Sequence, residues 1–217
     1  MNLQHRALHV LAGGLLGVSC GATASPTTHI ADSAVQIVAN GCHSAEVHGA
    51  GLMVAAGKVA TVAHVVAGAT SVEVRSARGT SAATVVYFDP ILDVAVLSVD
   101  AALATPIGIG SATAGDRGNV IVYRDDAPVN LPAEVQRLVD IRTADIYGEG
   151  KHIRPGYELK LDIRAGDSGA VVVIGGKAVA LVWATSRRAE SRAWAMRASL
   201  IADHLSTNAP VDNGECP

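Results

Sequence analysis

Aromatic residues are scarce in this sequence: one Phe, two Trp and four Tyr occur among 217 residues. Charge is also sparse, because Asp, Glu, Lys and Arg make up 17% of the chain against 49% hydrophobic residues. This balance excludes an intrinsically disordered chain. A core without large rings must be built from small and β-branched side chains, which suit packed strands. The formal net charge of −3 gives no electrostatic case for a nucleic acid partner.

Long hydrophobic runs are also lacking. The apolar run from residue 7 to about residue 18 is short for a membrane span and is interrupted by His9 and by glycines. It follows a polar start and precedes “ATA”, which is typical of a secretory signal peptide over residues 1–24, cleaved after Ala24. We therefore expect a secreted or periplasmic protein without a stable membrane span. An uncleaved anchor and a lipoprotein site at Cys20 are the alternatives.

Cysteine is almost absent. Removal of the leader would leave two of the three cysteines, Cys42 and Cys216. An even count in an exported chain suggests one disulfide that closes nearly the whole domain, and two free thiols are the alternative. Cys42, His43 and His48 also read as part of a zinc site, but a fourth ligand at suitable spacing is missing. We expect no metal and no cofactor.

Short apolar runs separated by turn residues are abundant. Residues 25–33 precede them and are expected to form a flexible mature N-terminus. About six runs lie between residues 34 and 100, and after a glycine-rich connector six more lie between residues 117 and 198. The last segment, residues 199–206, has helix spacing with Ser199 as the N-cap.

This organisation predicts an all-β fold of two packed antiparallel six-stranded β-barrels with a short C-terminal helix. Strands do not alternate with helices of about 10–15 residues, which disfavours a parallel α/β sheet. No internal repeat or coiled-coil heptad is present. We expect one domain over residues 34–217 and a monomer.

The stretch “AGDSGA”, residues 165–170, is either a nucleophile turn or a polar turn between strands. A serine nucleophile needs a base, and the base needs an orienting acid. His64 stands where a strand runs out into a small-residue turn, and a structural histidine is the alternative. Asp93 directly precedes the apolar strand “VAVLSV”, whereas Asp89 precedes a proline and Asp100 follows the strand.

The motifs “TVAHVV”, “DVAVL” and “GDSG”, in the order His, Asp, Ser, resemble the trypsin-like serine proteases of the chymotrypsin fold. The resemblance covers nearly the whole mature chain. “AHVVAG”, “DIYG” and a cysteine at each end are also similar to actinobacterial membrane-anchored periplasmic serine proteases linked to acid resistance. The resemblance implies a chymotrypsin-like fold and a serine endopeptidase that acts on a protein or peptide through an acyl-enzyme.

Residue by residue, the resemblance implies that Ser168 is the nucleophile, His64 the general base and Asp93 the acid that orients it. The backbone N–H groups of Gly166 and Ser168 are expected to form the oxyanion hole. No Arg or Lys followed by Ile-Val-Gly-Gly precedes the first strand, so Asp167 lacks the N-terminal ammonium with which it pairs in animal members.

Substrate specificity is less clearly encoded. Asp162 lies six residues before Ser168, the offset at which trypsin-like members often place the floor of the S1 pocket. A buried acid satisfied by backbone donors is the alternative, and it is favoured because this loop varies. The other S1 wall is expected from Val182, Trp183 and Ala184. Trp183 is otherwise a core residue.

Two rival functions remain open. A protease-fold binding or scaffold protein with silenced chemistry is suggested by Gly169-Ala170-Val171, which stands where the family usually has Gly-Gly-Pro. An esterase-like hydrolase would use the same three residues. The complete set of nucleophile, base and acid favours the endopeptidase.

Overall fold

The computed structural model describes residues 30–186 and 188–217. The predicted signal peptide, residues 1–24, lies outside the described residues. Within them, no helix is long and apolar enough to cross a membrane.

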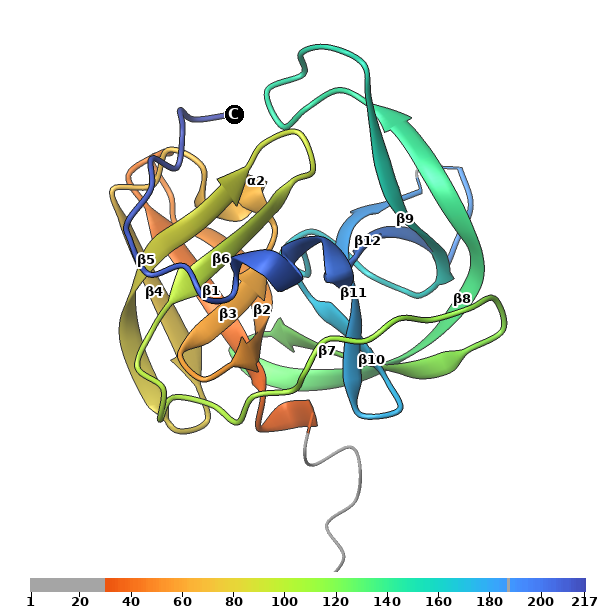
Figure 1. Cartoon of the computed structure of the whole chain (residues 1–217), viewed down its shortest axis with the longest axis horizontal. Helices are drawn as coiled ribbons and strands as arrows, with labels where there is room; N and C mark the ends of the chain where they lie inside the picture. Colours follow the sequence, from red (N-terminus) through yellow and green to blue (C-terminus); the bar gives the residue numbers. More distant parts are fainter. Residues whose placement is uncertain (1–29, 187) are drawn as a thin grey trace, which may run out of the picture.

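The described residues form two closed antiparallel barrels of six strands each, which lie side by side (Figure 1). This confirms the predicted all-β, two-barrel fold. The strands of the first barrel are β1 (Ala34–Asn40), β2 (Val47–Ala55), β3 (Lys58–Thr61), β4 (Ser71–Ser76), β5 (Gly79–Asp89) and β6 (Val94–Ser98). Those of the second are β7 (Arg117–Arg124), β8 (Ala127–Thr143), β9 (His152–Lys160), β10 (Val171–Ile174), β11 (Lys177–Thr185) and β12 (Arg192–Arg197).

Both barrels have the same strand order. The first runs β1-β2-β3-β6-β5-β4 and closes where β1 pairs with β4. The second runs β7-β8-β9-β12-β11-β10 and closes where β10 pairs with β7. The topology is therefore repeated although the sequence shows no repeat.

Small side chains fill both cores, as the composition predicts. Strand β1 is buried along six of its seven residues, “AVQIVA”. Among the described residues, Tyr157 is the only fully buried aromatic side chain, at 2% exposure. Ala, Val and Leu supply most of the rest, because closed barrels of short strands leave little interior space for rings.

Strand β8 is the longest strand and contains two prolines, Pro128 and Pro132, in its first half. Over residues 127–133, β8 pairs only with β7, because its pairing with β9 begins at Glu134. Proline is tolerated in a strand segment that has a free edge.

Three local expectations differ from the structure. The run that contains His64 is not one strand, because β3 ends at Thr61 and a short helix, α2 (Ala63–Val66), follows. The terminal segment is a 3₁₀-helix, η1 (Ala198–His204), without a side-chain cap, so Ser199 is not its N-cap. The end of the segment predicted to be flexible is packed, since Ile30 is 5% exposed and belongs to a hydrophobic core cluster with residues of both barrels.

Candidate active site

Strand β2 of the first barrel contacts α2, which carries His64, and also contacts β7 and β10 of the second barrel. The N–H of Ala50 donates to the carbonyl oxygen of Ser168 at 2.7 Å. A Cβ on the neighbouring Gly49 would lie 2.7 Å from the methyl carbons of Val65 and 3.1 Å from the same Ser168 oxygen. Glycine at this position therefore allows α2 and the turn of Ser168 to pack close together against the same face of β2.

His64 and Asp93 are in direct contact. The Nδ1 atom of His64 lies 3.1 Å and 2.9 Å from the two carboxylate oxygens of Asp93, and the His64 backbone N–H donates to Oδ1 at 3.0 Å. The Asp93 side chain is 3% exposed and the His64 side chain is 30% exposed. Since an ionised carboxylate only accepts, Nδ1 carries the proton and Nε2 is left as the acceptor.

Asp93 has a positive φ of 59°, in the left-handed region. This conformation occurs directly before β6 and turns the side chain back toward α2, from which His64 donates. The other two acids serve turns. Asp89 accepts the N–H groups of Ile91 and Leu92, and Asp100 accepts the N–H of Ala102.

Ser168 lies on a tight turn with a glycine of positive φ two residues before it and another directly after it, Gly166 at 92° and Gly169 at 85°. A Cβ on Gly169 would overlap the carbonyl oxygen of Ala50, so this position requires glycine. In the turn, the N–H groups of Asp167, Gly169 and Ala170 donate to backbone carbonyls.

The N–H groups of Gly166 and Ser168 donate to no acceptor among the described residues. The Ser168 hydroxyl likewise forms no hydrogen bond with another described residue, His64 included. The turn thus presents one hydroxyl and two backbone donors that protein groups do not occupy. Hydrogen bonds between a nucleophile and its base are often long before substrate binds.

Arg124 is the partner of Asp167 that sequence reasoning missed. Asp167 is 1% exposed, and its Oδ2 atom accepts a hydrogen bond from Arg124 Nη2 at 2.7 Å and from the Arg164 N–H at 2.9 Å. The hydrogen bond that Arg124 donates to Asp167 raises the pKa of the Arg124 guanidinium. Arg124 is the last residue of β7, and no spacing rule connects it with a turn 43 residues later.

The predicted specificity residues do not form one pocket. Asp162 is exposed and lines a cavity of about 360 Å³ with Arg117 and Lys160, in which Ser168 takes no part. It is thus neither placed below the nucleophile nor buried. Val182 is 0% exposed in the core of the second barrel, so it is not a pocket wall. Val182 ends a run of five consecutive buried residues in β11, and Trp183 and Ala184, where the pairing with β12 shifts register, are half-buried.

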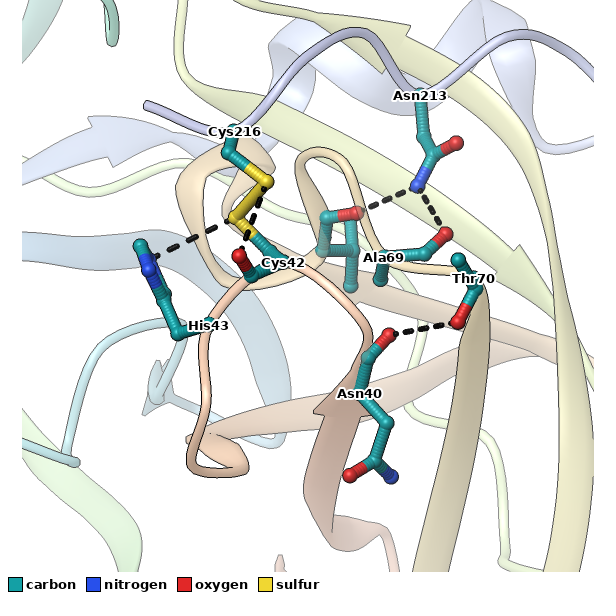
Figure 2. The surroundings of a disulfide bond; sticks show 8 residues. Asn40, Cys42, His43, Ala69, Thr70, Asn213 and Cys216 are labelled. Carbon is teal, nitrogen blue, oxygen red and sulfur yellow. Dashed lines mark hydrogen bonds between the residues drawn. A yellow bond between two sulfur atoms is a disulfide. The ribbon is translucent and has the colours of Figure 1, made fainter.

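The C-terminal segment, residues 211–216, runs along the first barrel and reaches α2 (Figures 1 and 2). Asn213 Nδ2 donates to the carbonyl oxygens of Val66 and Ala69 at 2.7 Å and 3.0 Å. At its end, Cys216 faces Cys42 with a Cα–Cα distance of 5.3 Å, within the range for a disulfide. This segment thus holds the carboxyl end of the helix that carries His64.

Among the described residues, no group of three or more His, Cys, Asp or Glu side chains lies together in a way that could hold a metal ion. Cys42 and His43 approach each other, with the sulfur 3.6 Å from Nε2.

Comparison with known proteins gives the family. The trypsin-like peptidase domain matches residues 49–181. The serine protease Rv3671c of Mycobacterium tuberculosis is 28% identical over 176 residues, which are 77% of this chain and 44% of that protein. This chain thus spans less than half the length of that relative.

Solved structures agree in fold. The active form of the Rv3671c protease superposes with a TM-score of 0.81 at 24% identity and covers 97% of this chain and 99% of its own. The inactive form of that protease superposes with a TM-score of 0.70 at 26% identity, and the match covers 83% of this chain and 91% of the inactive-form chain. The predicted enzyme class, a serine endopeptidase, is the class of these relatives, and the chain belongs to the family of trypsin-like peptidase domains.

Proposed function

We propose that this chain is a serine endopeptidase that hydrolyses peptide bonds through Ser168, His64 and Asp93. The observation that carries the proposal is the contact between His64 and the buried Asp93 carboxylate, at 2.9 Å from Nδ1. A carboxylate that holds the Nδ1 proton leaves Nε2 free to act as a base. The position of Ser168 also supports the proposal, because its carbonyl oxygen and Val65 of α2 lie around the same face of Gly49 on β2.

In this mechanism, Ser168 Oγ bonds to the scissile carbonyl carbon while its proton passes to Nε2 of His64. The carbonyl oxygen becomes an oxyanion. The C–N bond then breaks as His64 donates the proton to the leaving amine, which leaves an acyl-enzyme. Water attacks the ester with His64 again as base, and release of the acid restores Ser168. Asp93 stabilises the imidazolium in both halves.

The backbone N–H groups of Gly166 and Ser168 are the proposed oxyanion donors. They are the two N–H groups between Gly166 and Ala170 without an acceptor among the described residues. Donors that are already aimed and need no rearrangement stabilise an oxyanion most, and removal of one typically costs about 3–4 kcal/mol of barrier.

The ion pair of Arg124 and Asp167 supports this turn from within the protein. Asp167 separates the two proposed donors, and its side chain is fixed by Arg124 and by the Arg164 N–H. We propose that Arg124 takes the place of an N-terminal ammonium, so that the oxyanion turn does not depend on cleavage before the first strand.

Trp183 and Ala184 are the proposed contacts for the substrate. Both lie on β11 and are half-buried. Asp162 and Val182 are not part of this proposal, because one is exposed beside another cavity and the other is in the core.

We further propose that residues 1–24 direct export and that Cys42 and Cys216 form a disulfide. The N-terminal pattern supports export, and the Cα–Cα distance of 5.3 Å supports the bond. A disulfide persists in an oxidising compartment, so the two proposals support each other.

The test is hydrolysis of a matched peptide amide and peptide ester by the purified protein. We expect both to be cleaved, both activities to be lost in Ser168→Ala, and both to survive in Ser111→Ala, which removes an exposed serine of the connector. Cleavage of the ester alone would favour an esterase. A folded protein that cleaves neither would be a silent scaffold.

A further inference from the structure

Arg154, on β9, is a fully buried cation next to the proposed active site. Its side chain is 2% exposed, although charged side chains are seldom buried without a close partner. Nε donates to the carbonyl oxygen of Ile91 at 2.6 Å, and Nη2 donates to that of Ala144 at 3.1 Å. These two bonds connect β9 with the loop before Asp93 and with the loop after β8.

The remaining guanidinium nitrogen faces the catalytic acid. Nη1 of Arg154 lies 3.7 Å from Oδ2 of Asp93. The same oxygen lies 2.9 Å from Nδ1 of His64, and Oδ1 also faces His64. The Asp93 carboxylate therefore stands between two cationic partners whenever His64 is protonated.

The flat side of the guanidinium covers Trp183. The Arg154 Cζ atom lies 4.8 Å from the centre of the Trp183 ring, a cation–π distance. Trp183 is one of the two proposed substrate contacts. One side chain thus touches the acid of the first barrel and a substrate wall of the second barrel.

Stability alone is a weak explanation for this arrangement. Burial lowers the pKa of Arg154, against the opposing effect of Asp93, Asp145 and Asp89, so the charge is held at a desolvation cost. Buried ion pairs are often no more stabilising than apolar residues of similar volume. Most of the other buried positions in the described residues are Val, Leu or Ala.

We propose that Arg154 is a positioning residue, which sets the orientation of Asp93 and Trp183 and, by competing for the Asp93 charge, keeps His64 in its basic form at more acidic pH. The proposal rests on the function proposed above. The charged groups that face Arg154 are Asp93 and Asp89 around the β5–β6 loop and Asp145 in the β8–β9 loop, with His64 beyond Asp93.

Two effects follow and are separable. Loss of the positive charge strengthens the hold of Asp93 on protonated His64, so the acidic limb of the kcat/KM profile moves to higher pH. Loss of the guanidinium hydrogen bonds and of the contact with the Trp183 ring misplaces Asp93 and Trp183, so kcat falls at every pH. A purely structural arginine would produce neither effect in the folded fraction.

The experiment compares wild type with Arg154→Met and Arg154→Lys. Activity on a peptide amide is measured across pH, and active sites are counted with a fluorophosphonate probe. In Arg154→Met we expect kcat to fall about 10- to 100-fold. We expect the acidic limb of the kcat/KM profile to move to higher pH by about one unit. Arg154→Lys keeps the charge, so its limb should stay at the wild-type position while kcat still falls.

The matched control is Arg197→Met. Arg197 on β12 also covers an aromatic ring, with Cζ 5.9 Å from the Tyr157 ring, but it faces the core of the second barrel. We expect this variant to keep the wild-type kcat per active site and the wild-type acidic limb.

An Arg154→Met protein with an unmoved limb and wild-type kcat would overturn the proposal. If Arg154→Met does not fold, the result for Arg154→Lys decides. A wild-type kcat in Arg154→Lys, or an acidic limb of its kcat/KM profile at higher pH than in the wild type, would also overturn the proposal. A wild-type protein that neither cleaves the amide nor reacts with the probe would refute the proposed function itself, which is a different outcome.

Discussion

The two barrels share a strand order but supply different kinds of parts to the site. The first barrel presents His64 and Asp93 already joined by hydrogen bonds. The second presents Ser168, whose hydroxyl bonds to no other described residue, on a turn held by the ion pair of Arg124 with the buried Asp167. The acid and the base are thus joined directly to each other, with Arg154 of the second barrel beside Asp93, whereas the turn of the nucleophile depends on a charge from another strand.

This difference predicts whether a substitution in each barrel reduces catalysis alone or also reduces stability. Substitutions at His64 or Asp93 remove chemistry from a barrel whose core is made elsewhere, by small side chains. Removal of Arg124 instead leaves a charged carboxylate without its ion-pair partner in the interior, so the second barrel should lose stability and geometry together.

The largest expected effect is chemical and lies in the first barrel. His64→Ala should lower kcat by about 10⁶-fold, because the serine loses its base. Asp93→Asn should lower kcat by about 10⁴-fold, since the amide no longer holds the required tautomer. Asn tolerates the positive φ of 59° at this position, so unfolding in denaturant should change little. Wild-type kcat in a folded Asp93→Asn protein would contradict the assignment of the acid.

The next effect is structural and lies in the second barrel. Arg124→Met should cost about 3–5 kcal/mol of unfolding free energy, because Asp167 at 1% exposure loses its charged partner. The control is Arg117→Met at the other end of β7, whose pair with Glu134 is exposed. Exposed pairs contribute about 0–1 kcal/mol. Equal losses in the two variants, measured by urea unfolding, would argue against a supporting role for Arg124.

A smaller loss is expected where the chain ends are joined. Replacement of Cys42 and Cys216 by Ser opens a loop of sequence separation 174 and should lower the unfolding free energy by about 2–4 kcal/mol. Reductant should lower the midpoint of thermal unfolding of the wild type and leave that of the double variant unchanged. If a strong reductant does not change the midpoint of thermal unfolding of the wild type, the proposed disulfide is not formed.

The smallest effect concerns Lys58, the first residue of β3, which has none of the proposed catalytic residues among its hydrogen-bond partners. Burial lowers its pKa from 10.5, although Nζ donates to Asn208 at 2.7 Å. The unfolded chain therefore binds the proton more tightly, and stability rises with pH from the lowered pKa up to 10.5. Compared with Lys58→Met, the wild type should gain unfolding free energy over that window. If the difference in unfolding free energy between the wild type and Lys58→Met stays constant with pH, burial does not lower the pKa of the Lys58 amine.

Much of the fold was predictable because it follows from local patterns. Short apolar runs bounded by turn residues predicted the two barrels. Local patterns do not predict that Pro128 and Pro132 belong to a strand, because proline usually interrupts one. Their tolerance depends on which strand pairs with β8 along those residues, which is a long-range property. The short helix α2 was hidden because “KVATVAHVV” has strand propensity throughout.

Only the site residues that belong to local sequence motifs could be predicted from the sequence. His64 and Asp93 were selected by their places at strand ends, and they are in contact. Arg124 and Arg154 were missed because each meets its acid through the fold, across 43 residues in one case and from the other barrel in the second. Val182 was misplaced because “VWA” does not reveal which residue of the strand faces inward.

The most direct test of the central claim is covalent labelling with a fluorophosphonate, followed by mass measurement of the modified peptide. The account predicts an adduct on Ser168 in the wild type and none in Ser168→Ala or His64→Ala. A folded wild-type protein that stays unmodified, or an adduct on any other serine, would contradict it.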